Sequence, residues 1–229
     1  MAKDDTSFSR LFLILFGTFL ACLLLSNIIA GKLIQVFGVV LPAAVILFPV
    51  TYILGDIFTE VYGYARTRYI IWIGFAANLF MSLLFLIVVA LPHPDFFADQ
   101  SAYARVLGST PRVVAASLLA YWCGEFANSA ALSVLKKATG GRQLWLRTIG
   151  STVIGQIFDT ALFIALAFAG TMPAKALLGM MLAQYLFKVL YEIVLTPVTY
   201  KVVAAVKRAE GIDAYDEGVA YNPFSLGGK

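Results

Sequence analysis

The residues best able to do chemistry in this chain are ionisable side chains that lie inside long apolar segments. Glu60 lies near the end of such a segment, and five others lie well inside: Asp56, Glu125, Asp159, Lys188 and Glu192. An ionised side chain at the centre of a bilayer costs roughly 2.5–3.5 kcal/mol, so five facing lipid would cost on the order of 15 kcal/mol. They must therefore face a bundle interior, pair with each other, or line a wet cavity.

Helical spacing sorts the polar residues into sets that share a face, because residues three or four apart are neighbours on a helix. The sets are Asp56 with Glu60, Glu125 with Asn128, Gln156 with Asp159, and Gln184 with Lys188 and Glu192. Trp122 lies one turn before the second set, and Asn27 adds a polar group near the end of the first apolar segment. The predicted binding residues for a small polar solute are Asn27, Asp56, Trp122, Glu125, Asn128, Gln156, Asp159 and Lys188.

Some of these side chains have a structural alternative to a direct role. Lys188 could neutralise Glu192 along one helix, or pair with Asp159 across two helices and lock the bundle. Glu60 is expected to be a solvated residue at a helix end. The strongest prediction of a polar site rests on three carboxylates that have no adequate cation nearby in the sequence: Asp56, Glu125 and Asp159.

The motifs of familiar enzymes are missing from the sequence. There is no G-x-S-x-G elbow, no H-E-x-x-H helix and no G-x-x-x-x-G-K-[ST] phosphate loop. His93 is the single histidine, and Cys22 and Cys123 lack metal-ligand spacing, so no metal or other cofactor is expected. An intramembrane aspartyl protease, with its proton-sharing dyad, would need a sequence context that is absent here. We expect neither catalysis nor nucleic-acid binding.

The elements that must position these residues are membrane helices. Of 229 residues, 61% are hydrophobic and 13% charged, whereas soluble domains have roughly 45–50% and 25%. A spanning helix needs roughly 20 mostly apolar residues, and hydropathy gives six segments, at 11–31, 41–63, 69–91, 112–135, 145–169 and 176–206. We predict an all-α integral membrane bundle of six transmembrane helices over residues 1–209, with a short amphipathic helix in 92–111 and a mobile, polar cytoplasmic tail over 210–229.

Positive charges predict the orientation, because cytoplasmic loops are enriched in Lys and Arg. With the N-terminus inside, twelve of the 17 basic residues are cytoplasmic: Lys3, Arg10, Arg66, Arg68, Lys136, Lys137, Arg142, Arg147, Lys201, Lys207, Arg208 and Lys229. Lys188 lies within a segment, and four are outside: Lys32, Arg105, Arg112 and Lys175. Both termini are therefore expected in the cytoplasm, in a multi-pass protein of the cytoplasmic (inner) membrane.

Two segments are similar to each other. Residues 53–60 and 153–160 both contain Gly-x-Ile-Phe followed by an acidic residue and a threonine. In a six-helix bundle with the N-terminus inside, these two helices run in opposite directions, as an inverted 3+3 repeat requires. The similarity covers eight residues, so an inverted repeat is one interpretation of it and chance similarity of apolar helices is the other.

At these residues the chain resembles the queuosine precursor transporter family, six-helix membrane proteins of the vitamin-uptake type. The resemblance covers nearly all of residues 20–200. It rests on Ser26-Asn27, Phe48-Pro49, Gly55-Asp56, Glu60-Val61-Tyr62-Gly63, Thr110-Pro111-Arg112, Ala116-Ser117-Leu118, Gly124-Glu125, Ser151-Thr152, Asp159-Thr160, Phe187-Lys188 and Pro197. Where the family pattern is Gly-Gln-x-x-Asp, this chain has Glu125 and Asn128, so the charge moves by one turn.

The resemblance implies import of a 7-deazaguanine, either 7-cyano-7-deazaguanine or 7-aminomethyl-7-deazaguanine, for the synthesis or salvage of the tRNA nucleoside queuosine. A carboxylate can accept both N–H donors on a guanine-like edge, and an aromatic face can stack on the base. One alternative is a substrate-binding membrane subunit for another purine-like or vitamin-like solute, driven by an external ATP-dependent partner. A membrane enzyme or a structural subunit is a rival from another class. The lipid bilayer and the small molecule are the expected partners, and a homodimer is one alternative for the assembly.

Overall fold

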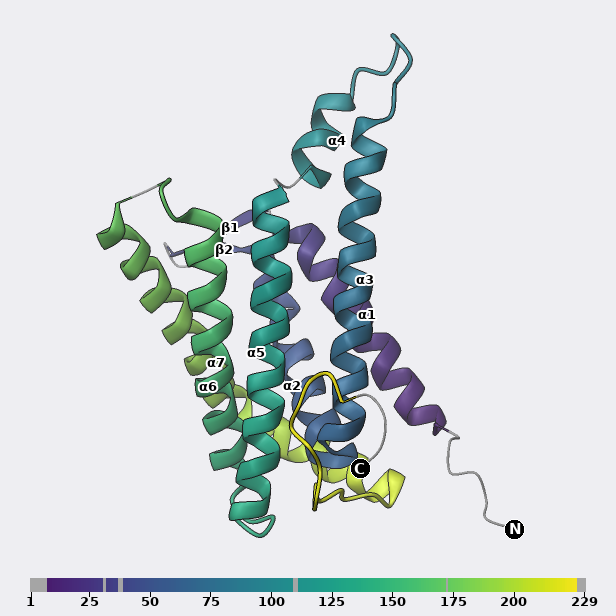
Figure 1. Ribbon diagram of the computed structural model, residues 1–229, viewed down its shortest axis with the longest axis vertical. Coiled ribbons are helices and arrows are strands. Elements are labelled where there is room, and N and C mark those ends of the chain that lie inside the picture. Colours follow the sequence, from purple (N-terminus) through teal and green to yellow (C-terminus); the bar gives the residue numbers. More distant parts are fainter. Residues whose placement is uncertain (1–7, 31, 37–38, 109–110, 172, 226–229) are drawn as a thin grey trace.

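The computed structural model describes residues 8–30, 32–36, 39–108, 111–171 and 173–225, and most of them are helical (Figure 1). The helices are α1 (Arg10–Ile29), α2 (Phe48–Ile57), α3 (Tyr64–Ala90), α4 (Gln100–Leu107), α5 (Pro111–Ala138), α6 (Leu144–Phe168) and α7 (Ala174–Glu210). In Figure 1, α3, α5 and α6 lie side by side along the long axis, with α1 and α7 inclined to them. The predicted helical class is confirmed, and so is a short helix in the 92–111 connection.

The segment that leads into α2 is not a helix, and here the all-α prediction was incomplete. Strand β1 (Leu33–Val36) pairs antiparallel with β2 (Val39–Pro42), and a short 3-10 turn, η1 (Ala43–Ile46), follows. The two strands are rich in Val and Ile, which favour extended backbone. Each strand has only four residues, and the predicted helical segment 41–63 took in the end of β2 and the 3-10 turn, whereas the helix itself begins at Phe48.

The second helical segment ends in a π-helical turn. η2 (Phe58–Tyr62) continues directly from α2, and all five of its residues are buried. Gly63 then takes a φ of 86°, a left-handed conformation that glycine adopts without steric cost. This residue turns the chain from η2 into α3 with no loop between them. A π-turn inside a helix often marks a functional position, and here it holds Glu60.

By length and composition, four of the described helices could cross a membrane: α1, α3, α6 and α7. α2 has only 10 residues before η2 begins. The apolar run of α5 is interrupted by Glu125 and Asn128. Three of the described helices thus miss the criterion: α2 and α4 are too short, and α5 is long enough but has polar residues in its apolar run.

The ends of the long helices gather their basic residues on one side of the molecule. α1 and α6 begin there, η2 and the start of α3 lie there, and α5 and α7 end there (Figure 1). We call it the basic end, because its described Lys and Arg residues include Arg10, Arg66, Arg68, Lys136, Lys137, Arg142, Arg147, Lys207 and Arg208. The tail, residues 211–225, turns back over this end after α7.

Candidate functional site

Two glycines bring α5 and α6 together at the level of the predicted polar residues. A Cβ on Gly155 would lie 2.7 Å from the Cβ of Asn128, and one on Gly124 would lie 2.7 Å from the Cβ of Asp159. Either distance is too short for a real side chain, so only glycine permits this approach, as at close helix contacts in membranes generally. The contact places Asn128 and Asp159 next to the seam between the two helices.

Asp56 and Asn128 meet across α2 and α5. Asp56 is 1% exposed, and its Oδ1 accepts a hydrogen bond of 3.3 Å from Asn128 Nδ2. Asp56 Oδ2 and Asn128 Oδ1 are both buried and have no hydrogen-bond partner within the described part of the chain. The Oε2 atom of Glu125 lies 3.6 Å from the place of a Cβ on Gly55. Three predicted residues are therefore brought together between α2 and α5, with unused acceptors on two of them.

Lys188 has a carboxylate partner on another helix. Its Nζ lies 2.5 Å from Asp159 Oδ2, in an ion pair between α7 and α6 whose side chains are 14% and 26% exposed. This confirms the pairing of Lys188 with Asp159 and not with Glu192, whose carboxylate is fully buried and has no partner among the described residues. No cation lies near Asp159 on its own helix; its partner is Lys188, 29 residues later along the chain and on another helix, as the cross-helix alternative predicted.

A groove of about 360 Å³ lies between α6 and α7. Its lining is mainly apolar, with three polar side chains: Gln156, Thr160 and Tyr185. Gln156 Oε1 and Thr160 Oγ1 are buried and lack a hydrogen-bond partner among the described residues. An apolar concavity with a few convergent polar groups is typical of small-molecule sites, whose volumes run from roughly 300 to 1,000 Å³.

Asn27 and Trp122 lie in other environments. Asn27 Nδ2 donates to Asn78 Oδ1 on α3 at 2.9 Å, so it joins α1 to α3. Trp122 packs with Trp72 and Phe224, at ring-centroid distances of 5.8 and 5.6 Å. Spacing along a single helix could not reveal these partners, since they belong to α3 and to the tail. The structure thus gathers Asp56, Glu125 and Asn128, adds the Asp159–Lys188 pair and Gln156 nearby, and gives the other two predicted residues different neighbours.

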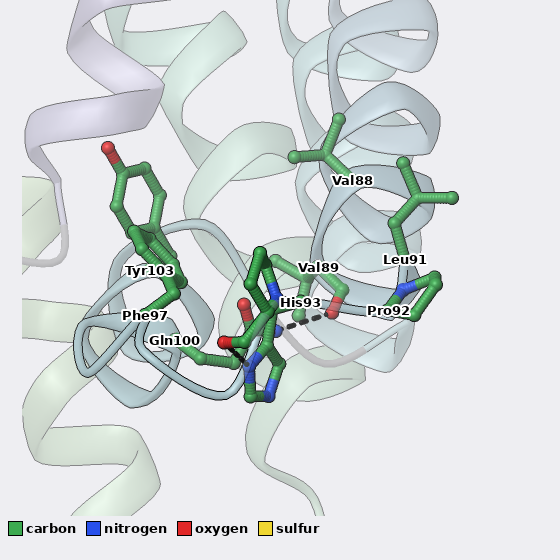
Figure 2. A pocket seen from close by; sticks show the side chains of 9 residues that line it. Val88, Val89, Leu91, Pro92, His93, Phe97, Gln100 and Tyr103 are labelled. Carbon is green, nitrogen blue, oxygen red and sulfur yellow. Dashed lines mark hydrogen bonds between the residues drawn. The ribbon is translucent and has the colours of Figure 1, made fainter.

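A second pocket lies between the end of α3 and α4 (Figure 2), at the opposite end of the molecule from the basic end (Figure 1). Its lining residues are Val88, Val89, Leu91, Pro92, His93, Pro94, Phe97, Gln100 and Tyr103. Gln100 Nε2 donates to the Val89 carbonyl at 2.8 Å, which ties α4 to α3. The lining is apolar apart from three side chains and contains no carboxylate, so it offers little to a ligand with several N–H donors.

Sequence reasoning missed a cluster of charges at the basic end. Glu60 is fully buried, and its Oε1 accepts hydrogen bonds from Arg147 Nη2 at 2.8 Å and Lys207 Nζ at 2.7 Å. Its Oε2 accepts from Arg147 Nε at 3.1 Å, and Lys136 Nζ lies 3.6 Å from Oε1. The expectation of a solvated Glu60 was wrong, because three cations from α5, α6 and α7 enclose it. We call these four residues, together with Asp213 of the tail, the ionic cluster.

Asp213 closes the ionic cluster from the tail. It binds Lys136, and its Oδ1 lies 2.8 Å from Lys207 Nζ. Burial by itself raises the pKa of Asp213, but the hydrogen bonds from the two lysines outweigh it, and the pKa is lower than that of a free aspartate. The Asp213 side chain remains 45% exposed.

The tail is held against α3 and is not the mobile segment that we expected. Both carboxylate oxygens of Asp216 accept a 3.0 Å hydrogen bond from the backbone N–H of Tyr64, at the start of α3. Arg68 and Trp72 donate to backbone carbonyls in residues 220–223, at 2.9–3.1 Å. A Cβ on Gly63 would lie 2.8 Å from Asp216 Oδ1, so glycine is needed there for space as well as for conformation. In the sequence, the tail's mixture of polar and aromatic residues after the last helix was the one feature that could have indicated these contacts.

Long apolar helices that enclose buried polar side chains define a multi-pass membrane protein with a polar interior. The chain belongs to the family described as "Putative vitamin uptake transporter", whose family model matches residues 42–202. This confirms the family predicted from the sequence motifs.

Two curated relatives carry more specific names. The "Probable queuosine precursor transporter" of Bacillus subtilis (strain 168) is 29% identical over 176 residues, which cover 76% of this chain and 77% of that protein. The "Queuosine precursor transporter" of Escherichia coli (strain K12) is 27% identical over 150 residues, covering 64% and 65%. No solved structure matches the chain. The family and the relatives are named for transport and not for catalysis.

Proposed function

We propose that the protein imports a queuosine precursor, 7-cyano-7-deazaguanine or 7-aminomethyl-7-deazaguanine, across the cytoplasmic membrane. The observation that carries the proposal is the buried Asp56–Asn128 pair, in which each side chain keeps one oxygen without a hydrogen-bond partner among the residues that the structure describes. The names of both curated relatives support the substrate class. They say only "queuosine precursor", so the choice between the two compounds is part of the proposal.

The chemistry of these acceptors matches the chemistry of the base. A guanine-like edge presents adjacent N–H donors, and carboxylate and amide oxygens accept such donors. Asp56 Oδ2 and Asn128 Oδ1 would each take one, which would satisfy buried groups that otherwise remain unpaired. Glu125, Gln156 and the Asp159–Lys188 pair would serve the remaining polar atoms of the ligand. Tyr185, in the groove between α6 and α7, would offer an aromatic face for stacking.

The proposed topology has six crossings. α2 with η2 would form the second crossing and α5 the fourth, in addition to the four long apolar helices. The gathering of basic residues at one end supports a cytoplasmic location for that end and for both termini. Residues 1–209 would then be the transporter domain, and 210–229 a cytoplasmic tail. The inverted repeat gains little support, because the first of its two segments is split between α2 and η2 whereas the second lies within the continuous α6.

The test is uptake of labelled precursor into liposomes that contain only this protein, combined with equilibrium binding to the purified protein. Asp56→Asn keeps the size of the side chain and removes its charge. A carboxylate hydrogen bond contributes roughly 1.5–3 kcal/mol, so we expect a loss of affinity of about tenfold or more. Asp99→Asn, at an exposed position before α4, is the matched control and should bind as the wild type does.

The outcomes separate the proposal from its rivals. Uptake by the protein alone supports a self-sufficient transporter. Binding without uptake would favour a subunit that needs an external ATP-driven partner, and chemical conversion of the precursor would favour a membrane enzyme. Wild-type affinity in the folded Asp56→Asn variant would move the site away from α2.

A further inference from the structure

Glu125, on α5, is a carboxylate of the candidate site that takes part in no salt bridge or side-chain hydrogen bond within the described ranges. It is partly exposed. Its Oε2 lies 3.6 Å from the place of a Cβ on Gly55, so the carboxylate lies at the contact between α2 and α5. A carboxylate accepts hydrogen bonds and attracts cations, and Glu125 has both capacities unused.

Charged groups from three other helices act on Glu125. Asp159 on α6 and Lys188 on α7 both do so, but these two bind each other, and their charges largely cancel. Asp56 on α2 also faces Glu125. It receives one hydrogen bond from Asn128 and forms no salt bridge with any residue that the structure describes. Two carboxylates without a basic partner in that part of the chain, Asp56 and Glu125, therefore share the space between α2 and α5.

Glu192, on α7, adds to this excess of acidic groups. It is fully buried, neither of its oxygens has a hydrogen-bond partner in the described part of the chain, and it acts on Asp56. A buried carboxylate without a cation is disfavoured unless it takes up a proton, and a bound cation can replace that proton. Among the described residues the site has more carboxylates than basic groups, which favours a cationic ligand over a neutral ligand of the same shape.

The two candidate substrates differ in charge at the 7-position. A primary amine is protonated at neutral pH, as in lysine, so the aminomethyl compound is a cation with three N–H donors. The nitrogen of the cyano group only accepts hydrogen bonds. A carboxylate also only accepts them, so it attracts the ammonium and repels the cyano nitrogen. The N–H edge of the base is common to both compounds and cannot distinguish them.

We propose that Glu125 binds the ammonium of 7-aminomethyl-7-deazaguanine and thereby selects this compound over 7-cyano-7-deazaguanine. This role rests on the proposed function, in which Asp56 and Asn128 bind the N–H edge. The 7-substituent lies away from that edge, on the other ring of the base. Glu125 precedes Asn128 by three residues, about 4.5 Å along the helix axis, so it lies one turn further from the basic end. A base with its N–H edge on Asp56 and Asn128 therefore has room to direct its 7-substituent toward Glu125.

The test compares three ligands in equilibrium competition against a labelled precursor, on the purified protein at neutral pH. The aminomethyl compound is a cation, 7-hydroxymethyl-7-deazaguanine is a neutral donor, and the cyano compound is a neutral acceptor. For the wild type we expect the affinity to fall in that order, with the aminomethyl compound bound about tenfold or more tighter than the cyano compound.

Three variants assign this preference to the charge of Glu125. Glu125→Gln removes the charge and supplies an N–H donor for the cyano nitrogen, so the two precursors should bind equally or the preference should reverse. Glu125→Asp keeps the charge and should keep a preference for the aminomethyl compound. Glu217→Gln, at an exposed position of the tail, is the matched control and should bind all three ligands as the wild type does.

Other outcomes overturn the inference. If the wild type binds the cyano compound as tightly as the aminomethyl compound, or more tightly, selection of the cation is refuted while the proposed function stands. An unchanged preference in folded Glu125→Gln, or an equal loss of preference in Glu125→Asp, would refute the role of the Glu125 charge. If Glu125→Gln does not fold, the order of the wild-type affinities and the behaviour of Glu125→Asp decide. If neither precursor binds to the folded wild type, the proposed function fails and the selection by Glu125 fails with it.

Discussion

Replacing Glu60 by Gln tests whether the ionic cluster joins the helices at the basic end. In the wild type, Arg147 binds both oxygens of the buried Glu60 carboxylate, and Lys207 shares one of them. Glutamine keeps the volume but removes the charge, so two cations lose their shared counter-charge. Loss of one partner of a buried ion pair costs roughly 3–5 kcal/mol. Arg147 would keep hydrogen bonds to the Arg142 carbonyl and the Thr139 hydroxyl, so we expect the lower end, about 3 kcal/mol.

The assay is equilibrium unfolding of the purified protein in mixed micelles, followed by tryptophan fluorescence. A loss of about 3 kcal/mol corresponds to a change of about 150-fold in the folding equilibrium. Asp213→Asn is the matched control, because Asp213 binds Lys207 and Lys136 but is 45% exposed. An exposed pair contributes only about 0–1 kcal/mol. If Glu60→Gln lost no more stability than Asp213→Asn, the reasoning that Glu60 is shielded from water would be refuted.

Three further predictions concern single side chains, each followed by the same unfolding measurement. Lys188→Met removes the cation from half-buried Asp159 and should cost about 1–3 kcal/mol; equal stability of this variant and of Lys175→Met would refute a structural ion pair. Asp216→Ala removes the acceptor at the start of α3 and should cost about 1–2 kcal/mol, whereas Glu217→Ala should cost nothing measurable. Because the pKa of Asp213 is lowered in the folded protein, its stabilising effect is present above its unfolded pKa of roughly 3.9 and is lost as pH falls through the lower folded value. The difference in unfolding free energy between wild type and Asp213→Asn should therefore be constant above about pH 5 and disappear in stronger acid; a difference that did not change with pH would refute it.

The long helices were predictable because a bilayer demands runs of apolar residues of a fixed length. The expected segment 145–169 coincides almost completely with α6 (Leu144–Phe168), and 11–31 with α1 (Arg10–Ile29). The hairpin before α2 and the π-turn after it were not predictable in the same way. Each involves only a few residues, and the choice between helix, strand and π-turn there depends on packing against other segments.

The partners of the polar residues were harder to predict than their positions. Spacing along one helix placed Glu125 and Asn128 on a shared face, and of the two partners considered for Lys188 the structure shows Asp159, on another helix. It could not place Asn78 beside Asn27, or the tail against Trp72, because those contacts join segments 51 and 151 residues apart. Glu60 shows the same limit, since Lys207 lies 147 residues further along the chain.

Asp56 and Glu60 show why residue type and helical face do not by themselves assign a role. They lie one turn apart in a continuous helical segment, and both are almost completely buried. Glu60 is surrounded by Arg147, Lys207 and Lys136, so its charge is balanced and its oxygens are occupied. Asp56 receives one amide and has Glu192 as its acidic neighbour. The first carboxylate therefore has little left to offer a ligand, whereas the second retains the capacity to accept donors or a proton, and this difference arises entirely from the helices packed against them.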